Sequence, residues 1–169
     1  NSAAYFGLGK VYKAQKEGRE GILKALPCFE KACEFNPDDL AAAYEYGKLL
    51  LELEEYKKAQ EFLEKVVDDH PNLVEPVTKL AEAYLESKEY KKAIDAYTKS
   101  LALDSTQINT YLGMARSYQG LNDYASAEKE YLKVAALNPQ LTLPYLYIGQ
   151  MYAGIKKYDT AINFLSKAI

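Results

Sequence analysis

Few side chains in this sequence have the chemistry or the spacing of a catalytic or metal site. Its two cysteines, Cys28 and Cys33, are five residues apart. On one helix that spacing puts their Cα atoms about 8 Å apart, which is too far for a disulfide unless the backbone moves. We therefore predict two buried thiols that behave as small apolar residues, a pattern that fits a reducing compartment.

The single histidine, His70, precedes a proline at an expected helix end. One histidine and two cysteines without CxxC spacing are too few for a zinc site, and we interpret His70 as a solvated turn residue. The sequence has no glycine-rich phosphate loop, no G-x-S-x-G and no HExxH motif. Lysines and glutamates at helical spacing, such as Lys57 and Glu61, are explained as surface ion pairs. We predict a protein that is not an enzyme and uses no cofactor or metal.

Composition and charge argue against two further classes of partner. Among the 169 residues, 49% are hydrophobic and 27% charged, which is typical of a folded chain. The formal net charge of -3 provides no basic excess for nucleic acid. No apolar run approaches the roughly 18 residues of a membrane-spanning helix. We expect no nucleic-acid partner, no direct membrane insertion and a cytoplasmic location, in a segment of a longer protein, because both ends interrupt helical patterns.

A 34-residue period organises the elements that carry these side chains. Tyrosines recur at positions 56, 90, 124 and 158, and each is followed three residues later by an alanine. Fixed self-similarity on this scale is typical of repeat architectures, in which each unit contacts only its neighbours. Apolar residues spaced i, i+3, i+4, i+7 predict helices throughout. The tyrosines of the period are expected to begin the second helix of each pair, where a ring can cover the turn.

We expect five helix pairs in one domain over residues 1–169, with repeats at about residues 2–39, 40–73, 74–107, 108–141 and 142–169, the last of them truncated. The first repeat is longer, because Gly9 and Gly47 are 38 residues apart, and we assign the surplus to the glycine-containing turn at residues 16–21. Small residues are expected where paired helices approach closely. They are Gly9, Gly47, Ala81, Ala115 and Gly149 in first helices, and Ala25, Ala59, Ala93, Ala127 and Ala161 in second helices.

Proline marks most of the expected ends of second helices, since it disfavours the α conformation in the residue before it. These ends are Asn36-Pro37, His70-Pro71 and Asn138-Pro139. In the third repeat Ser105 replaces the proline, and the cluster at residues 104–106 is expected to stop one helix and cap the next.

The sequence resembles the tetratricopeptide repeat family, whose pattern is W-x2-L-G-x2-Y, then A-x3-F, then P. The first repeat reads Tyr5-x2-Leu8-Gly9-x2-Tyr12, Ala25-x3-Phe29 and Pro37. The fifth reads Tyr145-x2-Ile148-Gly149-x2-Tyr152 and Ala161-x3-Leu165. This resemblance covers nearly the whole chain. It implies an all-α, right-handed superhelical solenoid of antiparallel helix pairs, with a concave groove lined by the first helix of each pair.

A subclass of the family clamps the C-terminal carboxylate of chaperones with lysines, asparagines and an arginine. The corresponding places here hold Phe6, Lys10, Glu45, Glu75 and Lys79. The two asparagines are missing and Glu75 occupies a lysine place. We therefore predict that this chain is not a carboxylate clamp.

The resemblance implies a non-catalytic module or scaffold that binds a protein or peptide segment in its groove. The groove residues we expect are Phe6, Lys10, Tyr44, Lys48, Leu51, Glu75, Glu82, Leu85, Leu112, Arg116, Leu146 and Gln150. Apolar members would anchor the ligand, and charged members would set its register. The acidic Glu75, Glu82 and Glu86 suggest a ligand with a basic residue. Alternatively, these are ordinary solvated positions, and Tyr44, Leu51 and Leu112 only cover neighbouring helices.

Two other roles stay open, namely a structural or self-assembling arm and a regulatory segment of a larger enzyme. We expect the last helix to expose Phe164, Leu165 and Ile169. Because solenoids need polar caps for solubility, this pattern predicts self-association through the C-terminal end, or a further helix that covers it.

Overall fold

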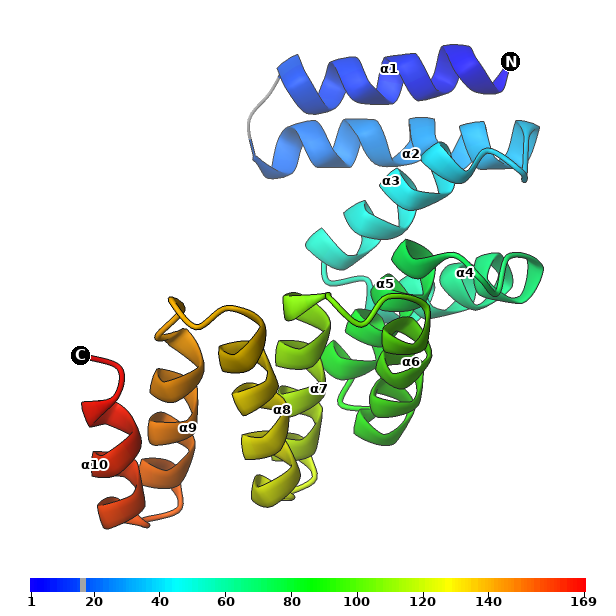
Figure 1. Cartoon of the computed structure of the whole chain (residues 1–169). Helices are drawn as coiled ribbons and strands as arrows, with labels where there is room; N and C mark the ends of the chain where they lie inside the picture. The colour runs from blue at the N-terminus through cyan, green and yellow to red at the C-terminus, as the bar shows by residue number, and fades with distance from the viewer. Residues whose placement is uncertain (16–17) are drawn as a thin grey trace. The chain divides into compact units, whose positions relative to one another are not determined.

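A computed structural model describes residues 1–15 and 18–169 (Figure 1). Of the expected turn at residues 16–21, Lys16 and Glu17 lie outside the described residues. The described residues form ten helices and no strand. The helices are α1 (Ser2–Gln15), α2 (Arg19–Phe35), α3 (Leu40–Glu52), α4 (Tyr56–Asp69), α5 (Val74–Glu86), α6 (Tyr90–Leu103), α7 (Ile108–Gly120), α8 (Tyr124–Leu137), α9 (Leu143–Gly154) and α10 (Tyr158–Ser166).

The chain divides into two compact units, unit 1 (Asn1–Ala83) and unit 2 (Tyr84–Ile169). In unit 1, α1 packs on α2, α2 on α3, and α3 on α4. In unit 2, the same succession runs from α6 through α7, α8 and α9 to α10. Within each unit these helices therefore pack on their neighbours in sequence, and the fold is an all-α solenoid of helix pairs, as predicted. The expectation of a single domain over residues 1–169 stays a prediction.

The second helices begin at the tyrosines of the period. Tyr56, Tyr90, Tyr124 and Tyr158 are the first residues of α4, α6, α8 and α10, which confirms that prediction. Each preceding turn contains a left-handed residue, Glu54, Lys88, Asn122 or Lys156, with φ between 61° and 63°. In the first of these turns the Glu55 N–H donates to the Leu50 carbonyl oxygen at 2.9 Å, which is the long-range bond of a Schellman motif. This bond recurs in the other three turns and reverses the chain between paired helices.

Small residues allow the two helices of a pair to approach closely. The alanines of the second helices, such as Ala59 and Ala127, are fully buried. A Cβ atom added at Gly47 would lie 2.8 Å from a methyl carbon of Leu63, and one at Gly9 would lie 2.8 Å from the ring of Phe29. The predicted role of the small residues is therefore confirmed, because a larger side chain would collide with the partner helix.

Pro27 lies inside α2, although an interior proline removes a backbone hydrogen bond. Two local details differ from the expectations. Asp104 ends α6 and its Oδ1 accepts from the Thr106 N–H at 2.9 Å, but α7 starts after Gln107, which makes no side-chain cap. Cys28 is buried as predicted, whereas Cys33 is only partly buried; both thiols are free.

Candidate protein-binding face on the first helices

The first helices carry every side chain that the sequence assigned to a groove. We call these positions the first-helix face and describe them unit by unit. In unit 1 the face comprises Phe6 and Lys10 of α1, Tyr44, Lys48 and Leu51 of α3, and Glu75 and Glu82 of α5. In unit 2 it comprises Leu85 at the end of α5, Leu112 and Arg116 of α7, and Leu146 and Gln150 of α9.

The apolar members of unit 1 are half-buried. The ring of Phe6 lies edge-on to Phe29 with centroids 5.6 Å apart, and the Lys10 ammonium sits 5.6 Å from the Phe6 centroid. Tyr44 and Leu51 are likewise neither fully buried nor fully exposed. Each therefore retains surface on which a ligand could pack, while its inner atoms cover the helices below.

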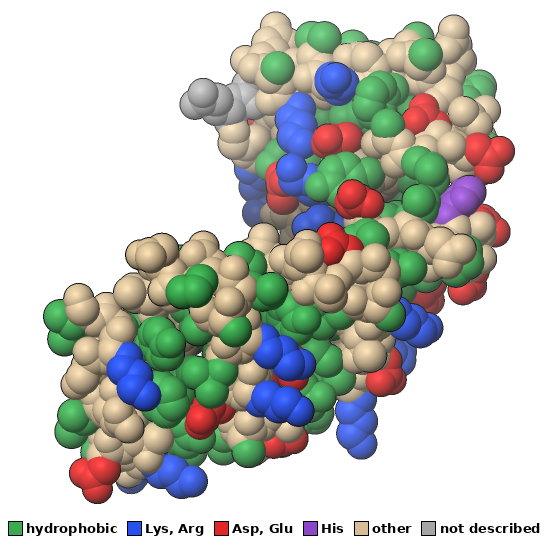
Figure 2. Space-filling view, viewed as in Figure 1, with side chains coloured by type: hydrophobic (Ala, Val, Ile, Leu, Met, Phe, Trp, Pro, Cys, Tyr) green, Lys and Arg blue, Asp and Glu red, His purple; other side chains and the backbone are tan. Residues whose placement is uncertain are grey.

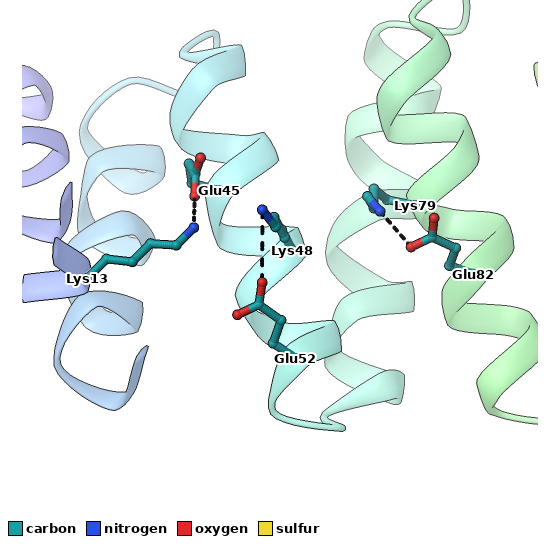
Figure 3. Close-up of polar contacts among 6 residues, drawn as sticks. All are labelled: Lys13, Glu45, Lys48, Glu52, Lys79 and Glu82. Atoms are coloured by element: carbon teal, nitrogen blue, oxygen red, sulfur yellow. Dashed lines mark hydrogen bonds and ion pairs between the residues drawn. The ribbon is translucent and has the colours of Figure 1, made fainter. Parts of the chain in front are cut away.

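Two charged members of unit 1, Lys48 and Glu82, belong to lysine–glutamate pairs, and a third pair links neighbouring side chains of α1 and α3 (Figure 3). Lys13 of α1 reaches Glu45 of α3 at 2.7 Å and so links two successive first helices. Lys48 lies 4.0 Å from Glu52 within α3, and Lys79 lies 2.7 Å from Glu82 within α5. These pairs are partly exposed at the surface, where an ion pair contributes about 0–1 kcal/mol to stability. A ligand charge can therefore replace either partner at little cost in folding.

Sequence reasoning missed Glu52 as a member of this face, and it predicted none of these ion pairs. Glu52 and Lys79 lie four and three residues from Lys48 and Glu82, so helical spacing alone could have identified both pairs. Lys13 and Glu45 are 32 residues apart in sequence, which is off the 34-residue period. Only the packing of α1 and α3 brings them together.

Unit 2 has a more apolar and aromatic face. Leu112 is partly buried and packs against the core cluster formed by residues such as Ala115, Tyr131 and Ile148. Leu146 is also partly buried, and Gln150 is exposed. Arg116 Nη2 lies 3.1 Å from Glu86 Oε1. Figure 2 shows hydrophobic side chains at the surface beside Lys and Arg side chains over α7 to α10.

Buried tyrosine hydroxyls brace the first helices of unit 2. The Tyr131 hydroxyl donates to Gln119 Oε1 at 2.7 Å, and the Tyr152 hydroxyl donates to Glu128 Oε2 at 2.5 Å. Burial raises the pKa of Tyr131 to about 12. Burial, together with the hydrogen bond to Glu128, raises the pKa of Tyr152 to about 12. Both tyrosines therefore stay neutral and hold their neighbours in place rather than acting as acids or bases.

Two expectations about exposure need correction. Leu85 is only 6% exposed, so it is part of the core and not an accessible anchor. Phe164 is buried as well, because its ring stacks on Tyr152 with centroids 6.2 Å apart. Leu165 is partly buried. Ile169 is fully exposed, and Tyr158 and Ile162 join it on the outer side of α10.

The acidic cluster expected to attract a basic ligand residue is largely neutralised within the chain. Glu82 pairs with Lys79, and Glu86 pairs with Arg116. Among the described residues, Glu75 is the member of the trio without an ion-pair partner, and it is exposed. The three carboxylates therefore do not act as one strongly negative site.

The thiols are poor nucleophiles. Burial raises the pKa of Cys28, and burial reinforced by the charge of Asp39 raises the pKa of Cys33 to about 12. A protonated thiol is unreactive. Within residues 1–15 and 18–169 no group of acidic, histidine or cysteine side chains could hold a metal ion. None of the helices described is long and apolar enough to cross a bilayer.

Comparison with known proteins assigns the fold to a superfamily. Residues 22–100 match the family model for anaphase-promoting complex, cyclosome, subunit 3, and residues 84–147 match a tetratricopeptide repeat model. The chain belongs to the tetratricopeptide repeat (TPR) superfamily. Among the curated proteins, none matches this TPR chain.

Solved structures of other TPR proteins have the same fold. A MamA protein superposes with a TM-score of 0.86 at 22% identity, covering 99% of this chain and 89% of that one. MamA from Desulfovibrio magneticus gives a TM-score of 0.87 at 18% identity, with 99% and 92% covered. A thermophilic TPR protein from Thermus thermophilus gives 0.73 at 20% identity, with 99% and 90% covered. At these identities the likeness shows the fold alone.

Proposed function

We propose that the first-helix face of this TPR protein binds a segment of another protein in a concave groove, without catalysis. TPR repeats serve in general as protein-interaction scaffolds. The observation that carries the proposal is the arrangement of the face itself. Half-buried apolar side chains, such as Tyr44, Leu51 and Leu112, alternate with charged pairs on first helices. Apolar side chains that keep part of their surface beside charged groups are a usual feature of a protein-binding surface.

Different members of the face have different roles in this proposal. Tyr44, Leu51, Leu112 and Leu146 contribute most of the affinity, because apolar groups that become fully buried dominate binding energy. Lys10, Lys48, Glu82 and Arg116 contribute selectivity and association rate. The ligand then carries charges of both signs that take over the partners of these side chains. A single basic residue opposite Glu75 is compatible with this pattern.

The experiment uses a partner captured with this chain and two charge insertions, Tyr44→Glu in unit 1 and Leu112→Glu in unit 2. Binding should weaken at least tenfold in each variant, because a carboxylate in a closed apolar contact loses its hydration. Helicity and melting temperature should stay near those of the parent. Lys57→Glu and Lys91→Glu, on the exposed sides of α4 and α6, are the matched controls. If both groove variants bind as well as the controls, the partner uses another surface.

A second candidate role is self-association through the C-terminal end. It is favoured by α10, on which Tyr158 is 60% and Ile162 62% exposed. A structural arm or a regulatory segment of a larger enzyme would use the same scaffold. We propose a cytoplasmic location for this interaction module, because two free thiols fit a reducing compartment.

A further inference from the structure

Charge is distributed unevenly over the first helices. The helices α1, α3 and α5 contain two, three and four charged residues, whereas α7 contains one and α9 none. The single charge on α7 and α9 is that of Arg116, a member of the first-helix face. Neither of these two helices, both fully described, carries a carboxylate. A negatively charged ligand group would therefore meet no repulsion from them, and Arg116 would be its counter-charge.

Arg116 has no acidic partner on its own helix. The positions three and four residues away on α7 hold leucine, glycine or glutamine, so Arg116 cannot form the pairing within a helix that Lys48 and Lys79 have. Its Nη2 instead donates to Glu86 Oε1 of α5 at 3.1 Å, and the two side chains are 57% and 38% exposed. A surface pair of this kind contributes about 0–1 kcal/mol to stability, so a ligand carboxylate can displace Glu86 at little cost.

The contact with Glu86 uses only part of the guanidinium group. It is one hydrogen bond from one nitrogen of Arg116 to one carboxylate oxygen. By comparison, the Lys133 ammonium of α8 contacts both carboxylate oxygens of Glu130, at 3.0 and 2.8 Å. A guanidinium has five N–H donors and binds a carboxylate most strongly through two parallel hydrogen bonds. A ligand carboxylate that approaches along this fork would satisfy more donors than Glu86 does.

Tyr131 of α8 connects the surroundings of Arg116 to α9. The Tyr131 hydroxyl donates to Gln119 Oε1 of α7 at 2.7 Å, and its ring lies against Tyr147 of α9, with centroids 5.6 Å apart. Burial raises the pKa of Tyr131 to about 12, and the positive charge of the nearby Arg116 acts against that rise. Because the amide oxygen of Gln119 is occupied, its amide N–H groups are left to donate. Arg116 and Gln119 are three residues apart, so two donor side chains are neighbours on one side of α7.

Apolar residues flank these donors on both helices. Leu112, one turn before Arg116 on α7, and Ala153 of α9 pack against the same core cluster. Leu146 of α9 is partly buried as well. A ligand segment that covers these side chains excludes water from the guanidinium, which strengthens its hydrogen bonds to a carboxylate. The surroundings of Arg116 therefore suit an acidic residue that has apolar neighbours in its own sequence.

We propose that the first-helix face of unit 2 binds an acidic side chain of the partner segment, flanked by apolar side chains, and that its carboxylate replaces Glu86 on Arg116. This inference rests on the proposed function and names the chemistry of the ligand at one part of the face. The sequence predicted a basic ligand residue near Glu82 and Glu86, but both of those carboxylates are paired within the chain.

The test begins with a random peptide library displayed on phage through the C-terminal end of each peptide. No free C-terminal carboxylate is then present, so an acidic group can come only from a side chain. Peptides that bind the parent chain, and bind Leu112→Glu at least tenfold more weakly, are the ligands of this face. They should share one aspartate or glutamate with apolar residues beside it.

The selected peptides are then synthesised with amidated C-termini, and their affinities are measured by fluorescence polarisation. Arg116→Gln should weaken binding at least tenfold. The matched control is Arg19→Gln, because Arg19 is the other arginine of the chain and is exposed at the start of α2; it should bind as the parent does. Replacing the acidic residue of the peptide by its amide should weaken binding to the parent equally, and should not weaken binding to Arg116→Gln any further.

Two further variants test the exchange of partners. Arg116→Glu should prefer a peptide whose acidic residue has been replaced by lysine. Glu86→Gln should bind the original peptide up to about fivefold more tightly, because a surface ion pair of up to about 1 kcal/mol no longer competes with the ligand. All variants should keep the helicity of the parent, measured by circular dichroism.

The outcomes separate this inference from the proposed function. If no enriched peptide depends on Leu112, the groove at this face is overturned and the inference with it. Peptides that depend on Leu112 but share no acidic residue, or that bind Arg116→Gln as well as the parent, would overturn the inference alone. An equal loss in Arg19→Gln would do the same, since it would show a long-range effect of net charge. Weaker binding to Glu86→Gln would show that Glu86 contacts the ligand and is not replaced.

Discussion

Units 1 and 2 have the same packing between paired helices but different side chains on their first-helix faces. In unit 1, lysine–glutamate pairs such as Lys13–Glu45 and Lys79–Glu82 dominate the face. In unit 2, leucines lie at the corresponding places, above a core cluster that includes Tyr131 and Tyr152. Among the described residues, the ion pair on the first helices of unit 2 is Arg116–Glu86. The repeat therefore conserves the small buried residues and leaves the exposed face free to vary.

This difference suggests a division of labour in binding. Surface ion pairs contribute little to stability, typically about 0–1 kcal/mol each; under the proposed function, those of unit 1 would serve partner selection. The half-buried leucines of unit 2 offer apolar area, which is the main source of affinity. The comparison holds only if equivalent positions in the two units respond alike to substitution, both where paired helices pack and in the turns between them. Three pairs of substitutions test that condition.

The largest effect is expected from exchanging the proline that distinguishes α2 from α8. Pro27 and Lys129 occupy equivalent positions, and Lys129 is exposed inside α8. Lys129→Pro should lower the free energy of unfolding by about 3 kcal/mol, because an interior proline removes a hydrogen bond and clashes with the preceding turn. Pro27→Lys should raise it by up to about 3 kcal/mol. Urea denaturation and amide hydrogen exchange in α2 and α8 would measure both.

Lys129→Ala is the control for the proline exchange and should be nearly neutral. A neutral effect of Lys129→Pro would contradict the expectation that an interior proline destabilises α8. If Pro27→Lys weakened unit 1, the proline would be required by its packing at this position of α2.

Overpacking the same small position in both units should have the next largest effect. Ala59 of α4 and Ala127 of α8 are both fully buried. Ala59→Leu and Ala127→Leu should each lower the free energy of unfolding by about 1–3 kcal/mol, since added methyl groups force the paired helices apart. Thermal melts followed by circular dichroism would show this. Lys129→Leu, on the exposed side of α8, is the control. An unchanged melt in Ala127→Leu would contradict the packing rule.

The smallest effect is expected at the left-handed turn residues. Glu54 in unit 1 and Lys156 in unit 2 both have φ of 62°. Left-handed backbone costs an L-residue about 1–2 kcal/mol. Glycine avoids this cost, but part of the gain is lost because glycine gives up more conformational freedom on folding. Glu54→Gly and Lys156→Gly should therefore each stabilise their unit by about 0.5–1 kcal/mol. Lys57→Gly, within α4, should instead cost about 1 kcal/mol. Equal destabilisation by glycine at all three sites would contradict the expectation that glycine is favoured at the left-handed turn positions.

The periodic features of the fold could be predicted from the sequence because they depend on local residue types. Tyr56, Tyr90, Tyr124 and Tyr158 begin helices, and alanines such as Ala93 are buried, as the period indicated. The left-handed turns could not be predicted in this way. Asn122 is a residue type that tolerates this conformation, but Glu54, Lys88 and Lys156 are not.

The candidate site was less accessible to sequence reasoning, because exposure depends on neighbours that the period does not specify. Leu85 occupies a regular place in a row of expected groove residues, yet the structure buries it. Phe164 was expected to be exposed because no helix follows it, but its ring instead stacks on Tyr152 of the preceding helix. Lys13 and Glu45 meet only because α1 and α3 pack together in space.

The buried tyrosines give the fold an alkaline limit through proton linkage. Burial raises the pKa of Tyr46 in unit 1, and it raises those of Tyr131 and Tyr152 in unit 2 to about 12. An unfolded tyrosine releases its proton near pH 10, so between pH 10 and about 12 the native state binds more protons than the unfolded chain. The contribution of these residues to stability is complete below pH 10 and is lost as the pH rises through that interval. With 16 tyrosines and no tryptophan, the ultraviolet absorbance of the phenolates would follow this loss directly, and the late-ionising rings should titrate together with the disappearance of helical signal.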